Sequence, residues 1–187
     1  NGSVWMRGKT FSPNLDGGAR AIIGGGAGPS GLPDLVQYFN MASSGNGLEW
    51  GDLPERQYLT AGTSSRTRGV FMGGYKNSPS FTYTNTIQSV EVASVGYTSD
   101  FGDLTQTAGY TGCLGNQTRA IRLGGTAPVN PSTNVMDYVT IATTGDAVDY
   151  GDISDGGRTS TNINSPTRGV FNVGSNTSGS PPSNLDY

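Results

Sequence analysis

Short hydrophobic segments alternate along the chain with polar stretches rich in Gly, Pro, Asn, Ser and Thr. The hydrophobic segments have a period of two: 68–73, for example, places Val70 and Met72 on one face and Phe71 on the other. A period of 3.6 residues, extended enough for a helix, occurs nowhere. The pattern predicts an all-β protein, and in the best-defined stretch it predicts strands at 57–61, 68–73, 86–93 and 97–101.

Two sequence markers recur together about every 50 residues. The first is an arginine followed by Ala or Gly and then Ile or Val, and it begins at Arg20, Arg68, Arg119 and Arg168. The second is an aromatic residue followed by Gly-Asp-Leu or Gly-Asp-Ile, with its aspartates at Asp52, Asp103 and Asp152. Because both keep one register, we expect four repeats of four strands, a to d. The small residue after each arginine predicts sheets stacked face to face.

The repeat resembles the kelch repeat in its double glycine at the end of strand b (Gly73-Gly74) and in Phe101-Gly-Asp-Leu. It departs from that pattern where Phe101 and Tyr150 replace a Trp, and in the degenerate end of strand b in the last repeat. The phrases at 67–74 and 136–145 are similar to kelch-like arrays in predicted virion structural proteins of marine bacteriophages. The resemblance implies a four-bladed β-propeller and no catalytic residue.

The two ends of the chain bear on closure of the ring. Segment 3–7 occupies a strand d position before the first repeat, and the last repeat ends inside strand c. Pairing of these two segments closes a propeller and removes its exposed edges. We therefore expect one domain over 1–187, with blades at roughly 8–53, 54–104, 105–153 and 154–187 plus 1–7. In the alternative, segment 3–7 completes the last blade of another copy.

Composition and charge argue against several classes of partner and of chemistry. The formal net charge is −3 and the 11 Lys and Arg are scattered, which argues against nucleic acid as a partner. No apolar run reaches the roughly 20 residues of a membrane-spanning helix, so we expect no membrane insertion. The chain contains no His, and Cys113, its only cysteine, lies in an apolar strand that favours a buried side chain over a nucleophile.

Three groups of polar residues are candidate sites. The series Asp146, Asp149, Asp152 and Asp155 suggests calcium, but its spacing does not match an EF-hand loop, so we interpret it as turn-forming acids and expect no metal. The repeat arginines and aspartates predict a repeated Asp–Arg contact in the scaffold, with a ligand-binding ring of arginines as the alternative. Three sequons for N-glycosylation begin at Asn1, Asn116 and Asn176.

The absence of reactive groups favours a non-enzymatic structural and adhesive module, located outside cells or on a virion surface. Its partners would be other copies of itself or other structural subunits. The alternative is a lectin-like propeller that binds a cell-surface glycan through the loop aromatics Tyr75, Phe81 and Tyr83. Neither hypothesis requires a cofactor.

Overall fold

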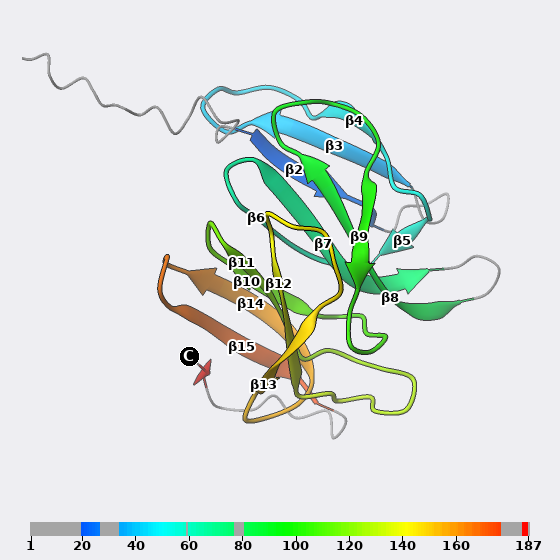
Figure 1. The fold of residues 1–187 in the computed structure, drawn as a ribbon, viewed down its shortest axis with the longest axis vertical. Coiled ribbons are helices and arrows are strands. Elements are labelled where there is room, and N and C mark those ends of the chain that lie inside the picture. The colour runs from blue at the N-terminus through cyan, green and yellow to red at the C-terminus, as the bar shows by residue number, and fades with distance from the viewer. Residues whose placement is uncertain (1–19, 27–33, 59, 77–80, 177–184, 187) are drawn as a thin grey trace, which may run out of the picture.

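The computed structural model describes residues 20–26, 34–58, 60–76, 81–176 and 185–186, and in these residues all regular elements except isolated bridges and turns are β-strands (Figure 1). Sheet 1 contains β2 (Arg20–Gly24), β3 (Leu35–Asn40) and β4 (Leu48–Asp52). Sheet 2 contains β5 (Gln57–Tyr58), β6 (Ala61–Ser64), β7 (Arg68–Lys76), β8 (Thr82–Glu91) and β9 (Ser99–Asp103).

The second half of the chain repeats this arrangement. Sheet 3 contains β10 (Gly112–Gly115), β11 (Arg119–Leu123), β12 (Val135–Thr140) and β13 (Val148–Asp152). Sheet 4 contains β14 (Arg158–Asn164), β15 (Gly169–Ser175) and β16 (Leu185–Asp186). Neighbouring strands are antiparallel and follow the order a, b, c, d within a sheet. The all-β prediction and the four-sheet repeat are therefore confirmed.

Strand boundaries in sheet 2 differ from the prediction in two ways. The predicted strand 57–61 is interrupted and forms β5 and β6, both paired with β7. Strands β7 and β8 continue past the double glycine, because the ladder shifts register between Met72 and Gly74 and resumes there. Gly73 and Gly74 take φ values of 65° and 128°, which glycine adopts readily and which form the bulge.

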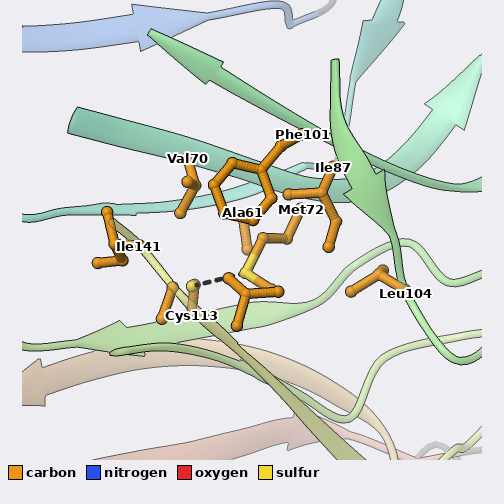
Figure 2. Packing of buried hydrophobic residues seen from close by; sticks show 10 residues of the cluster. Ala61, Val70, Met72, Ile87, Phe101, Leu104, Cys113 and Ile141 are labelled. Carbon is orange, nitrogen blue, oxygen red and sulfur yellow. Dashed lines mark hydrogen bonds between the residues drawn. The ribbon is translucent and has the colours of Figure 1, made fainter. Parts of the chain in front are cut away.

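The sheets stack face to face in sequence order, from sheet 1 at the top of Figure 1 to sheet 4 at the bottom. A hydrophobic core fills each of the three interfaces. Figure 2 shows the central core, where Val70 and Met72 of β7 meet Cys113 and Ile141 of sheet 3. Phe71, between them in sequence, packs into the core between sheets 1 and 2. The predicted alternation of strand b is therefore confirmed.

Small residues receive bulky side chains at these interfaces. A Cβ at Gly169 would lie 2.3 Å from Leu114 Cδ1 of the neighbouring sheet, and one at Gly24 would lie 3.1 Å from Phe71 Cζ. Such interdigitation is how stacked sheets reach close packing. It explains why a small residue follows the arginine in the last repeat.

The last strand supports the predicted end of the repeat. In β16, Asp186 pairs with Phe171 of β15, as Asp137 of β12 pairs with Arg122 of β11. The chain therefore reaches strand c of the fourth repeat. Segment 3–7, which we predicted to complete this sheet, lies outside the described residues.

Candidate functional site

The same main-chain contact joins sheet 1 to sheet 2 and sheet 2 to sheet 3. The carbonyl of Trp50 accepts a hydrogen bond from Gly96 N at 3.0 Å, and the carbonyl of Phe101 accepts one from Gly145 N at 2.8 Å. The carbonyls two residues further along repeat the pattern: Asp52 O accepts from Thr98 N, and Asp103 O accepts from Ala147 N. In each case the turn before strand d of one sheet is bound along strand d of the previous sheet.

The glycine of the Gly-Asp marker makes this approach possible. A Cβ at Gly51 would lie 2.2 Å from Gly96 O, and one at Gly102 would lie 2.4 Å from Gly145 O. Real Cβ atoms do not approach a carbonyl oxygen this closely. The marker is therefore a docking position between sheets.

The repeat arginines also join neighbouring sheets. Arg20 Nη1 donates to Val92 O at 2.9 Å, and Arg68 Nη1 donates to Ile141 O at 3.1 Å. Val92 and Ile141 come directly after β8 and β12, which are strand c of the next sheet in each case. Arg68 also pairs with Glu91 at 2.7 Å, so the predicted pairing with a repeat aspartate is wrong for this arginine. Asp52 and Asp103 contribute main-chain carbonyls to the contacts between sheets.

Two further repeat arginines have comparable places. The guanidinium of Arg20 lies 5.2 Å from the ring centroid of Tyr38, and that of Arg119 lies 4.9 Å from the ring of Tyr138. Arg168 follows the same kind of turn as Arg68. In both, the arginine amide donates to a serine hydroxyl three residues earlier at 3.1 Å. These contacts favour the scaffold role over the ligand-binding ring.

Among the described residues, sheet 3 makes this main-chain contact with sheet 2, but strand d of sheet 3 makes no equivalent contact with sheet 4. Tyr150 occupies the position of Trp50 and Phe101, which are 4% and 3% exposed, yet Tyr150 is 47% exposed. It borders a groove of about 340 Å³ between sheets 3 and 4, whose lining includes Arg119 and Ile121. A Cβ at Gly151 would meet nothing nearer than Met136 Cε at 4.0 Å. In the described part of the chain, the edge of β13 is therefore open to a further segment.

A buried ion pair in sheet 3 escaped the sequence analysis. Arg122 and Asp137 lie opposite each other on β11 and β12, both side chains are fully buried, and the Arg122 guanidinium donates to Asp137 Oδ2. Arg122 Nη1 also donates to the carbonyls of Gly124 and Val135, and Thr105 donates its hydroxyl to Asp137. The one available signal was a charged residue where the second and fourth repeats have Phe.

The three aromatic residues predicted to contact a glycan are brought together. The ring centroids of Tyr75 and Phe81 are 5.8 Å apart and stacked, and those of Tyr75 and Tyr83 are 4.8 Å apart in an edge-to-face arrangement. Tyr58 extends the group, with its ring centroid 5.4 Å from that of Tyr75. Phe81 is 65% exposed. We call Tyr58, Tyr75, Phe81 and Tyr83 the aromatic cluster.

Two residues beside this cluster were not identified from the sequence. Arg158, the first residue of β14, places its guanidinium carbon 4.0 Å from the ring centroid of Tyr110. Burial raises the pKa of Tyr83, and the nearby hydroxyl of Tyr110 raises it further while Arg158 lowers it. Burial also raises the pKa of Tyr58, again with Tyr110 contributing. These tyrosines keep their hydroxyl protons at neutral pH.

Two members of the acidic series accept main-chain hydrogen bonds, one of them between sheets and the other within β13. Asp146 Oδ1 accepts a hydrogen bond from Asp103 N of the neighbouring sheet at 3.0 Å, and Asp149 Oδ1 accepts one from Gly151 N at 3.3 Å. Among the described residues, no group of three or more His, Cys, Asp or Glu has the arrangement of a metal site.

The candidate glycosylation sites differ in what the structure describes. Asn116 Nδ2 donates to Pro166 O at 3.1 Å, and Asn116 Oδ1 accepts from the amides of Thr118 and Arg119. The Oδ1 end therefore holds the turn before β11, and the Nδ2 end links this turn to the one before β15. Asn1 lies outside the described residues, as do the two residues that complete the sequon of Asn176.

Cys113 lies in the central core (Figure 2), where its Sγ donates to Met72 Sδ at 3.6 Å. Burial raises the pKa of its thiol to about 12. Because the thiolate is the reactive form, we expect the folded protein to resist iodoacetamide at pH 8 and the urea-unfolded protein to react fully. Mass spectrometry of the alkylated chain measures both. Rapid labelling of the folded protein would contradict this burial.

No protein-family model matches the sequence, and no curated protein matches it. In the described residues, no helix has the length and hydrophobicity to cross a membrane. The class is therefore defined by the fold and its contacts: an all-β repeat protein of four stacked antiparallel sheets, joined by a repeated main-chain contact.

Proposed function

We propose that the chain is a non-enzymatic structural and adhesive module, used outside cells in a fibre or on a phage particle. In this proposal the four sheets are the blades of a four-bladed propeller, and the fourth blade is completed by the N-terminal segment. The observation that carries the proposal is the open edge of β13, where Tyr150 is 47% exposed although its equivalents are buried.

The geometry of the other interfaces supports the identity of the missing segment. The turn before β9 passes Trp50, and the turn before β13 passes Phe101. A fourth strand added beside β16 would enter past Tyr150 in the same way. Segment 3–7 has the sequence position of such a strand, and strand addition to an open edge uses main-chain hydrogen bonds. Segment 3–7 of another copy links copies head to tail into a fibre.

Deletion of residues 1–8 tests the proposal. We expect the deleted protein to lose head-to-tail assembly, because the edges of β13 and β16 stay unpaired. Light scattering and electron microscopy measure particle length, and thermal unfolding of dilute protein measures stability. If segment 3–7 closes its own ring instead, the melting temperature falls while the protein is monomeric throughout. Unchanged assembly together with unchanged stability would refute both versions.

A matched pair of glycine variants tests the docking edge. Gly151 and Gly26 have φ values of 127° and 124°, and neither Cβ would contact another atom closer than 4.0 Å. Gly151→Ala and Gly26→Ala thus impose similar backbone strain, of about 1–3 kcal/mol. We expect only Gly151→Ala to shorten the assemblies, since its methyl group occupies the docking position. Equal effects of the two variants would show that β13 is not part of the interface between copies.

Glycan binding is the second candidate, favoured by the aromatic cluster. Exposed rings that stack and present hydroxyl groups suit the apolar faces and polar edges of sugars. An adhesive module with such a surface would attach a fibre or particle to a cell. A glycan array incubated with the purified chain tests this candidate, and binding to none of its sugars would reject it.

A further inference from the structure

The aromatic cluster continues into a row of side chains from two other parts of the chain. Tyr75 stacks with Phe81 and contacts Tyr83 edge to face. The Tyr83 ring packs on the next backbone segment, because a Cβ at Gly109 would lie 2.9 Å from Tyr83 Cδ1. Tyr110 follows directly, with Arg158 over its ring at 4.0 Å. The row therefore begins at an exposed phenyl ring and ends at an exposed guanidinium.

The charge at the end of this row lies over an aromatic ring. The Arg158 guanidinium contacts the ring of Tyr110, and no carboxylate within the described residues pairs with it. Lys76, at the end of the strand β7 that carries Tyr75, is neutralised by Glu55 at 2.7 Å. Arg158 thus leaves its guanidinium donors available in a chain whose net charge is −3.

The backbone under the arginine is held in a costly conformation. Tyr110 has a φ of 56°, and it is the only residue other than glycine with a positive φ in the described part of the chain. Left-handed backbone is strained at a bulky residue, and such strain is concentrated at ligand-binding and active sites. Here the conformation places the Tyr110 ring beneath Arg158. The guanidinium therefore lies over a ring that a defined backbone conformation holds in place.

We propose that this row binds an acidic oligosaccharide such as an oligouronate, with successive sugars on the rings and a carboxylate on Arg158. The apolar C–H face of a pyranose packs on Phe81 and Tyr75, and the hydroxyl groups of Tyr83 and Tyr110 donate to or accept from sugar oxygens. The guanidinium binds a carboxylate through two parallel hydrogen bonds. The inference rests on the glycan-binding candidate and is independent of head-to-tail assembly.

Titration calorimetry tests the inference with the full chain and two probes, a hexamer of mannuronate or galacturonate and a neutral hexamer of mannose. We expect binding of the acidic probe, weakening as salt is raised from 50 to 500 mM, since screening reduces attraction between exposed charges. Arg158→Gln should weaken acidic binding by about tenfold or more, through loss of a charge-assisted contact. Phe81→Ser should weaken binding of the acidic probe, and also of the neutral probe if the wild type binds it.

Tyr97→Ser is the matched control, because Tyr97 is 80% exposed and is not part of the row. It should leave both affinities unchanged, and thermal unfolding should show that Phe81→Ser and Tyr97→Ser are equally folded. Equal binding of both probes, or unchanged acidic binding by Arg158→Gln, would overturn the acidic preference but keep glycan binding. Binding of neither probe, with an empty glycan array, would overturn both.

Discussion

Replacing Arg122 with Met should lower the free energy of unfolding by about 3–5 kcal/mol, because Asp137 would be left fully buried without its cation. Arg122 also donates to the carbonyls of Gly124 and Val135, and both would lose this hydrogen bond, although Val135 O would still accept from Gly124 N. Asp137→Asn should cost a similar amount, since the guanidinium would then be the uncompensated charge. Urea titration followed by tryptophan fluorescence measures these differences.

The repeat supplies a control for this ion pair. In sheet 2 the equivalent cross-strand pair is Phe71 and Gln88, which are also buried. The double variant Arg122→Phe with Asp137→Gln removes both charges together and introduces a pair that this fold already accommodates. Its loss should be much smaller than that of either single variant. A double variant as unstable as Arg122→Met would mean that shape, and not charge, dominates the site.

Gly102→Ala should destabilise the protein by about 2–5 kcal/mol, because its methyl group would overlap Gly145 O of the next sheet. Gly145→Ala is the matched control. Gly145 has a φ of 154°, against 148° at Gly102, but a Cβ there meets no atom within 4 Å. The control therefore carries the backbone strain without the overlap. In thermal unfolding, the melting temperature of Gly145→Ala should be well above that of Gly102→Ala. Equal melting temperatures would show that the docking contact is dispensable.

The sequence predicted the sheets because each marker lies at a fixed structural position. The arginine stands at the start of strand b, and the Gly-Asp marker lies in strand d at the contact with the next sheet. Such positions keep their residues for reasons that act within one repeat or between adjacent repeats. A repeat period therefore gives the number of sheets and the order of strands within them.

Other features depend on how different repeats meet in space. The interruption between β5 and β6 has no counterpart in the pattern of hydrophobic residues. Arg122 and Asp137 alternate with apolar residues as exposed polar residues also do, so their burial was not visible. Tyr110 and Arg158 belong to different repeats, and only the approach of β14 to the strand β10 brings them together. Aromatics close in sequence, such as Tyr75 and Tyr83, were predictable because one hairpin carries them.

The three separate cores have a consequence for how the molecule opens. The central core joins sheets 2 and 3 and contains more buried residues than either outer core, while sheets 1 and 4 each contribute to one core. In arrays whose units contact only their neighbours, the terminal units open first and at a smaller free-energy cost. Amide protons of β7, β8 and β11 should therefore exchange with deuterium last, and those of β2 and β3 among the first. Under tension such a module would yield from its outer sheets inward, so that it extends before it fails.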